Sequence, residues 1–227
     1  MFSLASFLPN YKVMPKTQSE ELFEAACGWY GMEFEPIPVG MSRTPDYVLY
    51  IKSQKVIVEV KQIDPNEEEK KNDRLLQSGR SICVSEIPGK RIYDEISDAN
   101  RQIKMYAKNF EPGFLVLWNS ALFTHHTAPE NVLFGMYGRP AISVDVGEGT
   151  HKTARHFGPS QGLHPRRNTS TSAVGVIQGE ITSPRLAVYH NVYSKVRLRH
   201  DFLRSLGIRQ FVLPEGIPGK YQEWMEI

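Results

Sequence analysis

The chain has 227 residues, of which 41% are hydrophobic and 23% charged, and its formal net charge is +2. These values suit one α/β domain over 1–227 and exclude a collagen-like, coiled-coil or disordered chain. The apolar runs are far shorter than the roughly 20 residues of a bilayer span, so no membrane association is expected. The start of the chain lacks the basic residues of a signal peptide, and the two cysteines lie far apart in sequence. Both features favour a cytoplasmic protein with reduced thiols.

Positive charge is concentrated late in the chain. Residues 151–209 hold ten Lys or Arg but two Asp or Glu, whereas the region before them is net negative. A basic block of this kind is what a phosphate-backbone partner requires. The ordinary surface charge of a solvated loop explains it equally well.

The first half of the chain predicts a helix followed by two strands. Ser19, an acidic first turn and an apolar stripe predict a helix over 19–30 that ends at Gly31. The β-branched and aromatic runs 47–51 and 56–60 predict two strands, and the short link between them fits a hairpin. Residues 64–73 are typical of a solvated loop or a frayed helix start.

The second half predicts further elements of the same domain. A periodic apolar face predicts a helix over 92–109, and the continuous apolar run 114–118 predicts a strand in the centre of a sheet. A short helix over 128–138 and strands over 173–177 and 186–190 are expected. Residues 145–172 are polar and aperiodic, which predicts a long loop. The order α-β-β-α-β indicates an α/β fold with a central mixed sheet flanked by helices.

The residues that carry chemistry stand at the two predicted strands of the hairpin. Asp46 opens the first strand, and Glu59-Val60-Lys61 closes the second. Residues i and i+2 of a strand share a face, so Glu59 and Lys61 project together, and a hairpin would bring Asp46 near them. Two close carboxylates repel unless a hard cation lies between them, and Mg²⁺ suits such oxygen ligands. Lys61 could then orient or deprotonate a water, or offset charge on a phosphate.

Each of these residues also has an ordinary explanation. A carboxylate at a strand end is usually a turn residue, and Glu-x-Lys at a strand edge is often a solvated pair. The apolar run 56–58 shifts the balance, because charged groups that close a buried strand are costly without a partner.

The ordered set resembles the PD-(D/E)XK nuclease superfamily. That pattern is an acidic residue on a first helix, Pro-Asp at the first strand and (Asp/Glu)-x-Lys at the end of the second. The chain offers Glu20 or Glu21, then Pro45-Asp46, then Glu59-Val60-Lys61. One branch of the superfamily also carries Gln-x-x-x-Tyr on the next helix, which Gln102 and Tyr106 match on the predicted second helix. The resemblance covers roughly residues 19–119.

The resemblance implies a restriction-endonuclease-like core and a role for each matched residue. Asp46 and Glu59 would hold Mg²⁺, or Mn²⁺, with the Val60 carbonyl, and Lys61 would position water. Gln102 and Tyr106 share a helix face and would brace Lys61 or the scissile phosphate. Of the two first-helix candidates, Glu20 is favoured over Glu21, and Glu24 is expected to face further away.

Other polar residues are weaker candidates. Arg166 and Arg167, within the predicted loop, suit bidentate phosphate contact, and Lys152 and Arg155 add to the same basic region. Five other polar residues, His125, His126, His151, His156 and His164, have no zinc-ligand spacing and are interpreted as surface histidines.

The sequence therefore predicts a metal-dependent nuclease, with DNA favoured over RNA as its substrate. The alternative is a catalytically silent nuclease-fold protein that acts as a nucleic-acid-binding subunit. A sugar- or nucleotide-processing enzyme is less favoured, because the chain has no glycine-rich phosphate loop. A homodimer and a helicase or other protein partner are both compatible with the sequence.

Overall fold

The computed structural model describes residues 15–38, 43–83, 87–107, 110–121, 125–147, 150–214 and 220–227. Its helices are α1 (Gln18–Tyr30), α2 (Glu67–Gln77), α3 (Lys90–Ala107), α4 (Pro129–Tyr137) and α5 (His200–Ser205). Its strands are β1 (Glu33–Pro36), β2 (Tyr47–Ile51), β3 (Gln54–Ile63), β4 (Gly113–Asn119), β5 (Pro140–Gly147), β6 (Thr150–Phe157), β7 (Thr171–Gln178), β8 (Arg185–His190), β9 (Arg209–Val212) and β10 (Met225–Glu226).

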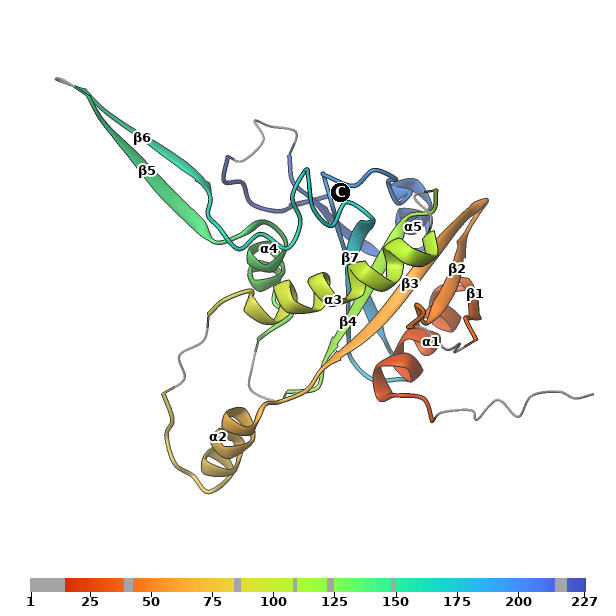
Figure 1. Cartoon of the computed structure of the whole chain (residues 1–227). Helices are drawn as coiled ribbons and strands as arrows, with labels where there is room; N and C mark the ends of the chain where they lie inside the picture. The colour runs from red at the N-terminus through yellow and green to blue at the C-terminus, as the bar shows by residue number, and fades with distance from the viewer. Residues whose placement is uncertain are drawn as a thin grey trace, which may run out of the picture.

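In this described part, one mixed sheet of eight strands runs in the order β1-β2-β3-β4-β7-β8-β9-β10 (Figure 1). The predicted hairpin is confirmed: β2 and β3 are antiparallel, with Tyr47 opposite Val58. β3, β4 and β7 are parallel neighbours. The run 114–118 indeed forms a central strand, and the predicted α/β class with a mixed sheet and flanking helices is confirmed.

The sheet separates two apolar layers, because alternate side chains of its central strands face opposite sides. Leu115 and Leu117 of β4 pack toward α3 and α4 in one buried cluster. Phe114 and Val116 point to the other side, where they pack in a second cluster with the apolar faces of α1 and α5. Both faces of the sheet are therefore covered, as an apolar central strand requires.

Close packing of α3 on α4 depends on a glycine. A Cβ atom added at Gly135 would overlap the side chain of Ile92 and the backbone oxygen of Gly89. The absence of a side chain lets the two helices approach, and it fixes the position of α3 over the sheet. That position matters because α3 carries one wall of the candidate site.

The expected loop over 145–172 is wrong in its first part. Residues 140–147 and 150–157 form the antiparallel hairpin β5-β6, which projects from the body of the domain (Figure 1). Its cross-strand pairs include Ile142 opposite Arg155 and Asp145 opposite Lys152. A ribbon that packs on no core needs no alternation of apolar and polar residues, so the sequence pattern did not show it. Residues 158–170 do form a loop without helix or strand.

Of the two alternatives expected for residues 64–73, the structure has the helix. Residues 67–77 form α2, which begins with a capping box in which Asn66 and Glu69 bind each other's backbone amides. The sequence pattern did not predict β1, α5, β9 and β10; each is short. Among the helices described, none combines the length and the apolar character that a bilayer span needs.

Candidate active site

Asp46 immediately precedes β2, and it forms hydrogen bonds with two backbone groups of β3. Its amide donates to the carbonyl oxygen of Val58 (3.0 Å), continuing the hairpin ladder by one residue. Its Oδ2 then accepts a hydrogen bond from the amide of Val60 (2.7 Å). In a strand, the N–H and C=O groups of one residue point toward the same neighbouring strand. The Val60 carbonyl therefore points, like the Val60 amide, toward Asp46.

Glu59 lies on the α3 side of β3 and is 2% exposed. Its Oε1 accepts a hydrogen bond from the side-chain amide of Gln102 on α3 and lies 2.8 Å from Nζ of Lys61. Its Oε2 is also buried, but no described residue gives it a hydrogen bond. A buried carboxylate oxygen without a donor is unusual, because leaving such a group unsatisfied costs free energy.

Lys61 bridges β3 to a carboxylate of α3. Its Nζ lies 3.3 Å from Oδ2 of Asp98 in addition to its contact with Glu59. Asp98 in turn pairs with Arg43 (3.3 Å) and Arg101 (2.8 Å) through its other oxygen. Sequence analysis missed Asp98, although it precedes Gln102 by four residues and the i, i+4 spacing of a helix would have placed both on one face.

Burial raises the pKa values of both carboxyl groups of the hairpin. Desolvation is the largest cause at Glu59, where it and the nearby Asp46 charge bring the pKa to about 7 despite Lys61 and Gln102. Desolvation also raises the pKa of Asp46 to about 6; the Val60 amide opposes this shift, and the charge of Glu20 adds to it. The surrounding residues thus neutralise only part of the negative charge of these two buried carboxylates.

Lys61 stays protonated in this setting. Burial alone would lower the pKa of its ammonium, but the carboxylates of Glu59 and Asp98 outweigh burial and raise that pKa. A nearby acidic residue, Glu95, has its own pKa raised, chiefly by burial. Of the two roles expected for Lys61, orienting a group electrostatically fits this environment better than accepting a proton.

The donor set fits a hard divalent cation. Asp46 and Glu59 offer carboxylate oxygens, one of which lacks any described partner, and the Val60 carbonyl points to the same side. The described residues contain no group of three or more His, Cys, Asp or Glu that could hold a metal. A cation here would accordingly be held by two carboxylates, a backbone oxygen and waters, which is the manner in which Mg²⁺ is usually bound.

Glu20 and Glu24, two acidic residues of α1, contact different parts of the structure. Glu20 raises the pKa of Asp46 through its charge, while its own Oε2 accepts hydrogen bonds from the Thr17 amide (2.6 Å) and hydroxyl (2.8 Å). It is therefore a helix cap close to the site; Thr17, not Ser19, is the N-cap residue. The expectation that Glu24 faces away is wrong, since its Oε1 accepts the Tyr47 hydroxyl (2.9 Å).

Tyr106 does not reach Lys61. It lies one turn beyond Gln102 on α3 and is 36% exposed, with Nζ of Lys55 6.0 Å from its ring centroid. α3 runs antiparallel to β3. Residues nearer the C-terminal end of α3 therefore lie opposite residues nearer the start of β3. Gln102 consequently contacts Glu59, and Tyr106 lies near Lys55. The described contacts do not include one between Lys61 and either residue, and the alternative expectation, a contact with the scissile phosphate, stays a prediction.

The four basic candidates lie away from these carboxylates. Lys152 and Arg155 are exposed on β6 of the projecting hairpin. Arg166 is exposed in the 158–170 loop, and the Arg167 guanidinium packs 5.9 Å from the centroid of the Tyr93 ring on α3. Five residues separate Tyr93 from Asp98, which puts them about 140° apart around the helix. Arg167 therefore lies on a different side of α3 from the site.

The structure thus brings Asp46, Glu59, Lys61 and Gln102 together, places Glu20 nearby and leaves Tyr106 one turn away. It adds Asp98 and its two arginine partners to the site. Comparison with known proteins gives no further guide to its chemistry: no protein-family model, no curated protein and no solved structure matches the chain.

Proposed function

We propose that the protein is a metal-dependent nuclease of the PD-(D/E)XK type, with a restriction-endonuclease-like core. The observation that carries the proposal is the buried Oε2 of Glu59, which has no donor in the described part of the chain and lies next to a second carboxylate with a raised pKa. A divalent cation would satisfy both groups. Structural ion pairs rarely leave a carboxylate oxygen in this condition.

The residues of the site have distinct roles in this proposal. Asp46 and Glu59, with the Val60 carbonyl, would hold Mg²⁺ or Mn²⁺. The bound cation would polarise a phosphodiester and lower the pKa of a water that attacks it. Gln102 holds Oε1 of Glu59, so Oε2 would be the oxygen available to the cation. Lys61, kept protonated by its two carboxylates, orients the water or stabilises the negative charge that builds on the phosphate.

The surroundings of the site support a polyanionic substrate. Arg43 and Arg101 are exposed and pair with Asp98. Each guanidinium can release this carboxylate and bind a phosphate oxygen instead. The hairpin β5-β6 presents Lys152 and Arg155 at a distance from the body, and a two-stranded ribbon fits the major groove of a duplex. We accordingly propose DNA as the substrate in preference to RNA.

Cleavage assays test the proposal directly. The full chain is incubated with linear duplex, nicked duplex and single-stranded DNA, and with RNA, in Mg²⁺, Mn²⁺ or EDTA. Cleavage is expected with either cation and none in EDTA. Asp46→Asn and Lys61→Ala should each lower the rate by about 10²-fold or more, since each removes a group that acts on the reacting atoms. Asp201→Asn and Lys104→Ala change exposed charges outside the site and should cut at the wild-type rate.

The proposal fails if no nucleic acid is cut, or if Asp46→Asn and Lys61→Ala cut as fast as the controls. One observation favours the second candidate function, a silent nucleic-acid-binding subunit. Lys61 already pairs with Glu59 at 2.8 Å, so part of the charge of the site is compensated without a cation. Salt-dependent DNA binding together with no cleavage under any of these conditions would establish that role instead.

A further inference from the structure

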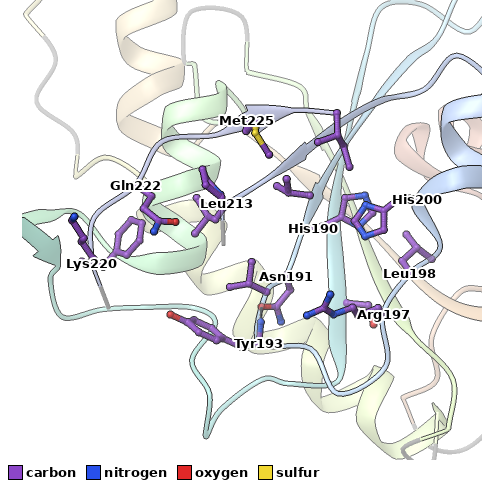
Figure 2. Close-up of a pocket in the computed structure, with 16 residues that line it drawn as sticks. His190, Asn191, Tyr193, Arg197, Leu198, His200, Leu213, Lys220, Gln222 and Met225 are labelled. Atoms are coloured by element: carbon purple, nitrogen blue, oxygen red, sulfur yellow. Dashed lines mark hydrogen bonds between the residues drawn. The ribbon is translucent and has the colours of Figure 1, made fainter. Parts of the chain in front are cut away.

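A cavity of about 530 Å³ lies away from the carboxylate site, at the edge of the sheet where β7 begins and β8 and β9 end (Figure 2). Residues 220–227 pass along one of its sides. This volume falls in the range of small-molecule sites, which run from about 300 to 1,000 Å³. Its wall combines apolar side chains with polar groups, as such sites commonly do. Leu198, Leu213 and Phe157 supply buried apolar surface.

The charged side chains that line the cavity are all of one sign. Arg197 and Lys220 both line it, and no Asp or Glu side chain does so within the described residues. Neither cation forms an ion pair with any described carboxylate. In Figure 2, Arg197 extends from one end of the cavity toward its middle, and Lys220 lies at the opposite end. Both side chains are exposed, and two cations that line one half-open cavity favour an anionic ligand.

A pair of stacked imidazoles forms the wall near Arg197. The ring centroids of His190 and His200 are 3.9 Å apart. Buried Gln210 fixes this arrangement: its amide donates to the His200 carbonyl (3.0 Å), so its oxygen must accept from Nε2 of His190 (2.9 Å). Nδ1 of His200 is buried and has no hydrogen-bond partner among the described residues. The rest of the His200 ring lines the cavity and is the part of this residue that a ligand would contact.

Arg197 and His200 also influence each other. The positive charge of Arg197 contributes to lowering the pKa of His200, although burial is the larger cause. Both residues line the cavity and lie at the same end of it (Figure 2). A bound anion would offset the positive charge of Arg197, whereas a cationic ligand would add to it.

We propose that this cavity binds a small organic phosphate, with its phosphate group at Arg197 and His200 and its apolar or aromatic body against Leu198 and Leu213. A phosphate suits this end because its several oxygens can accept from a guanidinium and an imidazole at once. The apolar wall distinguishes an organic phosphate from the free ion. The inference does not rest on the nuclease proposal, since neither Asp46 nor Glu59 lines the cavity.

Calorimetric titration of the full chain in EDTA tests this inference apart from any cleavage. The probes are phenyl phosphate, adenosine 5′-monophosphate, inorganic phosphate and benzoate. At least one of the two organic phosphates should bind with a Kd of about 1 mM or below, roughly tenfold more tightly than inorganic phosphate. Benzoate tests whether a carboxylate serves as well, and it should bind more weakly than phenyl phosphate.

Two substitutions locate the ligand. Arg197→Gln should weaken organic phosphate binding by about tenfold or more. The matched control Arg185→Gln, which removes an exposed charge outside the cavity, should bind as wild type does. Val192→Trp should block binding because Val192 lines the cavity, while its backbone amide keeps its bond to the Tyr137 hydroxyl (3.1 Å). Circular dichroism checks that each variant is folded.

Four results would overturn the inference. The first is no binding of either organic phosphate up to about 5 mM, which is weaker than a functional site of this size should give. The second is equal affinity for inorganic phosphate, and the third is tighter binding of benzoate. The fourth is wild-type affinity in a folded Arg197→Gln variant.

Discussion

Replacing Glu59 by glutamine tests the most unusual feature of the candidate active site, a buried carboxylate whose Oε2 has no donor in the described structure. The folded protein holds the pKa of Glu59 at about 7, against an ordinary value of 4.5. The folded state therefore binds more protons than the unfolded state between these values, and stability falls as pH rises from about 4.5 to about 7. Above that window the protein must bury an ionised group that a glutamine would not present.

The size of the effect follows from the same pKa values. A rise from 4.5 to about 7, at about 1.4 kcal/mol for each pH unit, means that the ionised carboxylate destabilises the fold by about 3 kcal/mol at pH 8. Glu59→Gln should therefore be more stable than wild type by about 3 kcal/mol at pH 8 in EDTA, or roughly 6–12 °C in Tm. At pH 5 the wild-type carboxyl is protonated in the folded state, and most of the difference should disappear.

Urea denaturation and thermal melts at pH 5 and pH 8 measure this difference. Other groups also make stability depend on pH. His190, for example, has a lowered pKa of about 4, which makes folding more favourable as pH rises toward 6.5. Comparing wild type and variant at the same pH cancels such contributions, because these groups titrate in both proteins. Glu68→Gln, at an exposed acid of α2, is the control and should show no pH-dependent gain.

Added Mg²⁺ or Mn²⁺ supplies the second half of the test. A cation that binds only the folded carboxylate pair should raise the stability of the wild type at pH 8 and have little effect on Glu59→Gln. The reasoning is refuted if the glutamine variant gains nothing at pH 8 in EDTA, or if its gain is the same at pH 5. A cation effect of equal size in both proteins would separately refute the proposed metal ligands.

Three further predictions concern other parts of the molecule. Gln102→Leu removes the amide that holds the buried carboxylate, so the acidic limb of a cleavage pH–rate profile should move to higher pH; an unchanged profile would contradict that role. Gly135→Ala should destabilise the fold by about 2 kcal/mol or more in urea denaturation, whereas Gly28→Ala, with open space around it on α1, should be neutral or slightly stabilising. Exchanging Lys152 and Arg155 together for glutamine should reduce the slope of log K against log salt for duplex DNA by about 2, and an unchanged slope would show that the hairpin does not touch phosphates.

The hairpin at the centre of the site could be predicted because it obeys local rules. β2 and β3 are short runs of β-branched and aromatic residues with a short link, so their pairing and the approach of Asp46 to Glu59 followed from strand periodicity. Gln102 was found because its motif matched a helical face that packs on the sheet. The same motif did not show that Tyr106 lies near Lys55, since helix spacing says which face a residue shares but not which strand residue lies opposite it.

Asp98 was missed for a related reason. An aspartate among the polar positions of an amphipathic helix looks solvated, and its contacts with Lys61 and Arg43 depend on how α3 crosses β3. Long-range crossing geometry has no local signature in the chain. The buried Oε2 of Glu59 could likewise not be foreseen, because its lack of a donor among the described residues depends on what long-range packing places beside the carboxylate.

The basic block of 151–209 shows how sheet topology separates sequence neighbours. Lys152 and Arg155 lie on the projecting hairpin, while Arg197 lines the cavity at the edge of the sheet. Arg209 pairs with Glu226 through both of its interacting nitrogens, at 2.7 and 2.9 Å. The sum over this stretch of sequence left a phosphate-backbone partner and ordinary surface charge equally open, and the structure shows that its residues face different surroundings.

The hairpin β5-β6 leaves and rejoins the domain at adjacent points. Pro140 pairs with Phe157, and the Gly158 amide donates to the Arg139 carbonyl (2.7 Å) across the base. The arm can therefore be shortened, lengthened or exchanged for another ribbon without rethreading any strand of the main sheet. Homologous chains are expected to differ in the length of this arm while keeping the same interior.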